Sequence, residues 1–176
     1  MIGFHSKKVP TLAGVHYYSQ GMAKTRAPIA DDYPRLLRWL PDAEALYLFA
    51  GPSIAWPPTL EQFEEIATRP GLTAWMVAEE HNQPAWGHFD LTLQERSARL
   101  GRVIIDPHSR GRGLGHTLIC LALDEARHLG AEEVRLAVIT GNTPAVNTYR
   151  RAGFREIVDP ERPQFTAMAY DLRERV

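Results

Sequence analysis

A loop with three alternating glycines constrains this chain more than any other stretch, because it separates an apolar run from a helix. The run at residues 103–105 is β-branched and stops at Pro107, since proline cannot continue a central sheet ladder. The loop reads Arg-Gly-Arg-Gly-Leu-Gly over residues 110–115, and the leucine- and alanine-rich segment 114–129 predicts a helix. The pattern therefore predicts a strand, a glycine loop and a helix N-terminus in succession.

This succession is typical of an anion site. Glycine lets several backbone N–H groups turn toward one point, and the first N–H groups of a helix are free and lie at the positive end of its dipole. The expected ligand therefore carries phosphate. The loop is not a P-loop, because it ends in Leu114-Gly115-His116 instead of Gly-Lys-Ser/Thr. It also departs from the G-x-G-x-x-G dinucleotide fingerprint, because its glycines follow the spacing G-x-G-x-G.

A second motif follows the next predicted strand, which spans residues 134–140. It reads N-x-x-A-x-x-x-Y-x-x-x-G-F from Asn142 to Phe154. Together with the R-x-x-G-x-G pattern of residues 110–115, in this order and at this separation, it resembles the GNAT superfamily of acyl-CoA-dependent N-acetyltransferases. The resemblance covers about residues 73–172.

The resemblance implies acetyl-CoA as the cosubstrate and a set of residues that hold it. In the family the loop amides bind the CoA pyrophosphate, the strand before the loop pairs with the pantetheine arm, and an asparagine contacts the pantetheine amides. Carried onto this sequence, the expected CoA-binding residues are Val103, Ile104, Ile105, Arg110, Gly111, Arg112, Gly113, Leu114, Gly115, Asn142 and Ala145. Asn142 can also cap the helix that follows it, and Arg112 lies outside the family motif.

Two residues are expected to carry the chemistry. The resemblance places Tyr149 near the acetyl sulfur, where a phenol can protonate the departing thiolate; a packing role in the core is the alternative. Asp90 shares a predicted strand face with Trp86, His88 and Thr92, and this face is expected to line the acceptor cleft. Asp90 or His88 would then take the proton from the amine. Many family members carry an acidic residue early in the strand before the glycine loop, whereas this sequence has Arg99 there.

The whole pattern predicts an α/β (α+β) fold, a GNAT-type mixed β-sheet of about six to seven strands with helices on both faces. The expected strands are at residues 25–30, 73–80, 84–93, 99–105, 134–140, 154–158 and 164–172, and a helix is expected at 143–152. Residues 1–24 are expected to be a loosely attached N-terminal extension, and residues 25–176 a single domain.

Composition argues against several classes of protein. The net charge of -1 provides no field that would attract nucleic acid or an anionic membrane. The single cysteine excludes an internal disulfide, and the seven histidines lack ligand spacing, so no metal is expected. No apolar run reaches the roughly 18 residues of a membrane span, and the expected location is the cytoplasm.

The expected reaction is direct transfer of an acetyl group from acetyl-CoA to a primary amine of a small molecule, a protein N-terminus or a lysine. A transferase for a longer acyl-CoA, a non-catalytic CoA-binding regulatory module and a homodimeric assembly stay open. Polyamines, amino acids and aminoglycosides are all open as small acceptors.

An RNA-binding module is disfavoured by the net charge and by the absence of an aromatic stacking pattern; its candidate residues are Arg96, Arg99, Arg102, Arg110 and Arg112.

Overall fold

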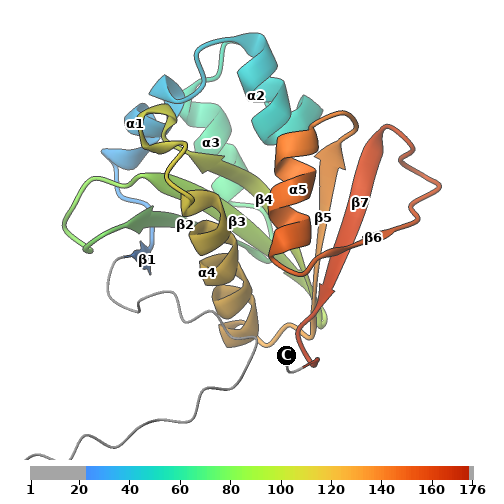
Figure 1. Cartoon of the computed structure of the whole chain (residues 1–176). Coiled ribbons are helices and arrows are strands. Elements are labelled where there is room, and N and C mark those ends of the chain that lie inside the picture. Colours follow the sequence, from blue (N-terminus) through green and yellow to red (C-terminus); the bar gives the residue numbers. More distant parts are fainter. Residues whose placement is uncertain (1–22, 175–176) are drawn as a thin grey trace, which may run out of the picture.

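The computed structural model describes residues 23–174, which form a seven-stranded sheet with helices on both faces (Figure 1). The strand order is β1-β2-β3-β4-β5-β7-β6. The strands span Lys24–Arg26 (β1), Leu72–Ala78 (β2), Gly87–Gln94 (β3), Ser97–Ile105 (β4), Glu133–Ile139 (β5), Arg155–Ile157 (β6) and Phe165–Asp171 (β7). The helices span Asp32–Arg38 (α1), Ala43–Ala50 (α2), Leu60–Ala67 (α3), Leu114–His128 (α4) and Thr143–Arg151 (α5), with short 3₁₀ helices at Gly51–Ser53 and Pro107–Ser109. The predicted mixed sheet between helices is confirmed.

Helix α4 covers one face of the sheet, together with α5 (Figure 1). Its buried side chains recur at helical spacing and form one apolar stripe: Leu118, Ile119, Ala122, Leu123 and Ala126. This stripe packs in one core with Phe89 and Leu91, which point from β3 to the same face of the sheet.

Helices α1, α2 and α3 cover the opposite face and enclose a second core. Leu36, Phe49 and Phe63 from these helices are buried there against Met76 of β2 and Ile104 of β4. The alternation of side chains along each strand thus supplies both cores, since Trp75 and Val77, the neighbours of Met76, point to the α4 side. Strand β2 is therefore packed from both faces.

Strands β4 and β5 pair in parallel, whereas every other neighbouring pair in the described sheet is antiparallel. The parallel pairing runs only from Ser97–Glu133 to Arg99–Arg135. Beyond this point β4 continues to Ile105 and β5 to Ile139 without pairing with each other. The two strands therefore diverge, and the β4 edge that faces β5 keeps backbone groups available for another extended partner.

A β-bulge interrupts β4 at the point where it diverges from β5. Asp90 of β3 lies opposite Gly101, while His88 lies opposite Ile104, so two steps along β3 match three steps along β4. Arg102 occupies the extra position and has a φ of 44°, in the left-handed region that a non-glycine residue rarely adopts. The bulge directs the Arg102 side chain to the same side of the sheet as Asp90.

The predicted boundaries after the glycine loop agree with α4, β5 and α5 to within one residue. The hairpin differs, because β3 begins at Gly87 and not at residue 84. Trp86 precedes the strand, does not follow its alternation and packs in the α4-side core, so its predicted place on the face of Asp90 is wrong. Strand β1 begins at Lys24, and residues 1–22 of the expected extension lie outside the described residues.

Candidate active site

A cavity of about 530 Å³ opens where β4 diverges from β5, and we call it the glycine-loop cavity. Strand β4, the glycine loop and the first turns of α4 and α5 line one part of it, and α1 and α2 contribute the rest. The lining residues are Trp39, Ala45, Leu48, Phe49, Val103, Ile104, Ile105, Ser109, Arg110, Gly111, Gly113, Leu114, Gly115, Leu118, Ile119, Asn142, Pro144, Ala145, Thr148 and Tyr149. It therefore gathers ten of the eleven residues predicted to bind CoA.

The glycine loop leaves the N-terminus of α4 open. Gly111 and Gly113 have φ values of 76° and 77°, and no atom lies within 4 Å of the position that a Cβ would take at either residue. Gly113 is the N-cap of α4 and no side chain caps the helix. The loop thus presents backbone N–H groups and the positive end of a helix dipole to open space, and this fits the phosphates of CoA.

The two loop arginines are placed differently. Arg110 lines the cavity, and its Nε donates a hydrogen bond to the carbonyl oxygen of Ile105 at 3.2 Å. Arg112 is exposed and is not among the lining residues. The loop therefore presents its backbone to the cavity, and the Arg110 guanidinium is partly engaged by the chain itself.

Asn142, which directly precedes α5, and Tyr149, which lies on α5, line the cavity opposite the glycine loop. Asn142 caps α5, since its Oδ1 accepts a hydrogen bond from the Ala145 N–H at 3.2 Å, and it also lines the cavity. Tyr149 is buried, its ring packs edge-on against Phe154 with 5.6 Å between ring centres, and burial raises its pKa above the ordinary value. Its hydroxyl makes no hydrogen bond within residues 23–174, so it can donate to a group that enters the cavity.

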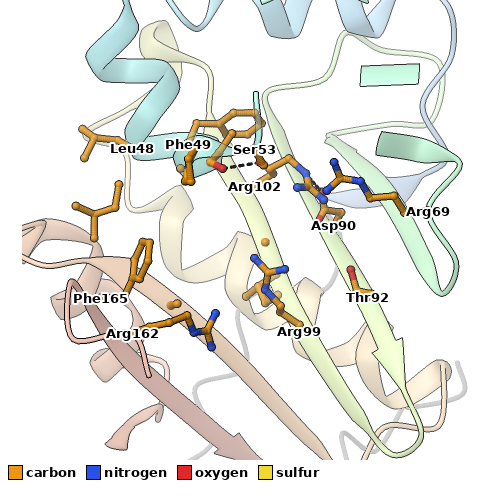
Figure 2. Close-up of a pocket in the computed structure, with 17 residues that line it drawn as sticks. Leu48, Phe49, Ser53, Arg69, Asp90, Thr92, Arg99, Arg102, Arg162 and Phe165 are labelled. Carbon is orange, nitrogen blue, oxygen red and sulfur yellow. Dashed lines mark hydrogen bonds and ion pairs between the residues drawn. The ribbon is translucent and has the colours of Figure 1, made fainter. Parts of the chain in front are cut away.

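A second cavity of about 280 Å³ lies on the α2 side of the diverging strands, and we call it the arginine pocket (Figure 2). Its lining residues are Leu48, Phe49, Ala50, Gly51, Pro52, Ser53, Arg69, Asp90, Thr92, Arg99, Leu100, Gly101, Arg102, Ala137, Ile139, Arg162 and Phe165. Leu48 and Phe49 of α2 line both cavities, so the two adjoin at this helix.

Asp90 lies in the arginine pocket, where its carboxylate pairs with the Nε of Arg102 (Figure 2). The two side chains are only 3% and 9% exposed. Burial raises the pKa of Asp90 above its ordinary value, while Arg102, Arg99 and Arg69 act in the opposite direction. A Cβ at Gly101 would lie 2.9 Å from Asp90 Oδ1, so the glycine leaves room for this carboxylate.

His88, the alternative base, is not among the residues that line either cavity. It is buried against Phe49, with 6.0 Å between the ring centres. Burial, assisted by the charge of Arg102, lowers its pKa to about 3, so the ring is neutral at pH 7. Thr92 does line the arginine pocket. Of the side chains predicted to form the acceptor face, only those of Asp90 and Thr92 therefore line a cavity.

Sequence reasoning missed the arginine pocket as a unit. Arg99 and Arg102 belong to one predicted strand. Arg69 and Arg162 lie in connecting segments, and no periodicity in the sequence relates them to β4. One signal was present: Gly101 inside a predicted strand is typical of a bulge, and a bulge redirects the following side chain.

Metal and membrane features are absent from the part of the chain that the structure describes. No group of three or more His, Cys, Asp or Glu side chains in residues 23–174 could hold a metal ion. Among the described helices, none is both long and apolar enough to cross a lipid bilayer.

Comparison with known proteins identifies the class that this fold and site define. The model of the Acetyltransferase (GNAT) family matches residues 36–154, which is more than half of the chain. The chain therefore belongs to this family.

Sequence relatives match over short segments. A mycothiol acetyltransferase from Clavibacter sepedonicus is 46% identical over 52 residues, which cover 30% of this chain and 17% of that protein. A streptothricin acetyltransferase from Streptomyces lavendulae is 44% identical over 50 residues, which cover 28% of this chain and 26% of that protein. The matches thus span only about a sixth to a quarter of these relatives' own length.

Solved structures resemble the whole described fold. A spermidine N-acetyltransferase from Vibrio cholerae, in complex with CoA and spermine, has a TM-score of 0.69 at 20% identity and covers 86% of this chain and 96% of its own. An aminoglycoside acetyltransferase in complex with coenzyme A has a TM-score of 0.69 at 14% identity and covers 85% and 94%. At these identities the likeness shows the shared fold.

Proposed function

We propose that this protein transfers an acetyl group from acetyl-CoA to the amine of a small molecule. The observation that carries the proposal is the glycine-loop cavity, in which an open helix N-terminus, an unpaired strand edge and a buried tyrosine hydroxyl meet. Two structural neighbours were solved in complex with CoA, and several similar proteins are named for the acetylation of small amines, which supports the same choice.

The backbone supplies most of the proposed binding of acetyl-CoA. The N–H groups of the glycine loop from residue 111 to 115 hold the pyrophosphate at the start of α4. The edge of β4 beyond Arg99 pairs with the amides of the pantetheine arm as an added strand would, and Val103 to Ile105 position the thioester. Asn142 stabilises α5 at the opposite wall. Acetyl-CoA supplies an activated acyl group whose bond to sulfur is broken in the reaction.

Direct attack by the amine requires two proton movements. The amine loses a proton, its nitrogen bonds to the acetyl carbon, and the carbon–sulfur bond breaks. Tyr149, which lines the cavity, is proposed to donate its hydroxyl proton to the sulfur as the thiolate leaves. Asp90 is proposed to accept the amine proton, directly or through water, because its raised pKa makes it a better base than an exposed aspartate. Holding both reactants in adjoining cavities supplies the proximity.

A panel of amines tests the proposal. The protein is incubated with acetyl-CoA and each amine, free thiol is measured, and the acetylated product is identified by mass spectrometry. Formation of an N-acetyl product that depends on the protein supports the function. Thiol release without any acetylated amine, or failure to bind CoA in calorimetry, contradicts it, and the same assay with longer acyl-CoA substrates tests the chosen acyl group.

A further inference from the structure

Four arginines from separate elements surround the arginine pocket. Arg69 follows α3, Arg99 and Arg102 lie on β4, and Arg162 lies in the segment between β6 and β7. Figure 2 shows their side chains converging on the pocket from different sides. Asp90 is the only carboxylate among the described residues that line it. The pocket is therefore strongly positive in a protein whose net charge is -1.

Internal pairing leaves much of this charge uncompensated. Asp90 neutralises Arg102, and Asp159, which does not line the pocket, lies 2.8 Å from Arg162. Within residues 23–174, the side chains of Arg69 and Arg99 have no hydrogen-bond or ion-pair partner. Since guanidinium groups stay protonated, both remain cationic.

The arginines are close enough to repel one another. The pKa of Arg99 is lowered by burial and by the charges of Arg102, Arg162 and Arg69, with Asp90 opposing them. The bulge that aims Arg102 at the pocket adds an unfavourable φ of 44°. Such clusters of like charge are unfavourable until an anion enters, and they raise the local concentration of anionic ligands.

The shape of the pocket suits a small acid. Guanidinium groups bind carboxylate and phosphate through paired N–H donors, which fix the orientation of the ligand as well as its charge. The volume of about 280 Å³ lies just below the range of about 300–1,000 Å³ that is typical of sites for drug-sized molecules, so the pocket suits a smaller group. Leu48 and Phe165 add apolar surface beside the arginines.

We propose that the arginine pocket binds an anionic group of the acceptor, so that the substrate is a small amine carrying a carboxylate or phosphate, such as an amino acid. This rests on the proposed acetyl transfer. The two cavities share Leu48 and Phe49, so a molecule held by its anion in one reaches toward the other with its amine. Polyamines and aminoglycosides, the acceptors named for two structural neighbours, are polycations and meet like charge here.

Matched pairs of amines separate this inference from the proposed function. The test compares L-phenylalanine with L-phenylalaninamide, which differ in a carboxylate, O-phosphoethanolamine with ethanolamine, which differ in a phosphate, and L-glutamate with spermidine. Acetyl transfer is measured for each, and calorimetry measures binding to the protein loaded with CoA. We expect each acid to be preferred over its uncharged or cationic counterpart by about 10-fold or more, with the preference shrinking as salt rises. The carboxylate and phosphate arms distinguish the two sources of anion.

Variants test whether the arginines are responsible. Arg99→Gln and Arg162→Gln should each raise the KM for the preferred acid by about 10- to 100-fold, because each removes a charged donor, while the KM for acetyl-CoA changes little. Arg96→Gln is the matched control: this side chain is 75% exposed, pairs with Glu132 and does not line the pocket. Circular dichroism confirms that the variants fold.

The outcomes are distinct. Acids that are preferred by the wild type and the Arg96 variant, but not by the Arg99 and Arg162 variants, support the anion pocket. Amides or spermidine acetylated as fast as acids, with no effect of Arg99→Gln, overturn it and leave acetyl transfer intact. If no amine is acetylated, the proposed function fails, and binding of acids that depends on Arg99 still decides whether the pocket recognises anions.

Discussion

The glycine-loop cavity and the arginine pocket adjoin at Leu48 and Phe49, yet they are built in opposite ways. The first presents backbone: two glycines with positive φ, an uncapped helix N-terminus and an unpaired strand edge. The second presents charged side chains that a bulge and two connecting segments bring together. A backbone site suits a ligand with a fixed pattern of phosphates and amides, whereas a side-chain site can differ between proteins of one fold.

The comparison predicts that the two cavities respond to different substitutions. Changes that alter the backbone or fill its open space should disable the glycine-loop cavity, and single side-chain truncations there should matter little unless the side chain takes part in chemistry. In the arginine pocket, single truncations should alter the selection of the acceptor.

The largest effect is expected from Gly113→Glu. The new side chain enters the open space above the start of α4 and places a negative charge where phosphate is proposed to bind, so affinity for CoA should fall by about 100-fold or more. Gly130→Glu is the matched control, since Gly130 has a φ of 83° and open space around it at the other end of α4. Calorimetry with CoA on both folded variants makes the measurement, and equal affinity in the two variants would remove the loop from the site.

The next largest effect is expected from Tyr149→Phe, which keeps the ring against Phe154 and deletes only the hydroxyl. Single-turnover acetyl transfer should slow by about 10²-fold, or near 2.7 kcal/mol, because the thiolate must then take its proton from water. Binding of acetyl-CoA should be unchanged. Tyr170→Phe is the control, since Tyr170 also contacts Phe154 but does not line the cavity. A Tyr149 variant as fast as the wild type would leave the tyrosine with a packing role alone.

Asp90→Asn addresses the arginine pocket, which Asp90 lines. If Asp90 accepts the amine proton, the rate of the wild type should rise with pH through the pKa of Asp90, which burial raises, and the variant should lose this acidic limb and about 10- to 100-fold in rate. If Asp90 only holds Arg102, the KM for the acceptor should rise while the pH–rate profile keeps its shape. The pH dependence of kcat/KM in both proteins separates the two roles.

The same contrast explains what the sequence could predict. The mixed sheet, α4, α5 and the glycine loop follow from local signals, because glycines, a proline stop and helical periodicity act on neighbouring residues. The other CoA-binding residues of the glycine-loop cavity were predicted from the resemblance to the GNAT family. Strand alternation predicts the face on which Asp90 lies, but the position of its partner Arg102 depends on an extra residue in β4. Arg69 and Arg162 join it only through tertiary packing, which no spacing in the sequence records.

The smallest effect is expected from Arg110→Gln, and it sharpens the comparison most directly. Arg110 matches the family motif, but its Nε donates to the Ile105 carbonyl oxygen and its side chain is exposed. An exposed charge contributes little because solvent screens it, so the affinity for CoA should fall by only about 3-fold, with the loss vanishing at high salt. Titration of CoA at low and high salt makes the measurement, with Arg112→Gln as the comparison outside the cavity. A loss as large as that of Gly113→Glu would mean that side chains, and not the backbone, hold the phosphates. Both cavities would then bind their ligands through charged side chains.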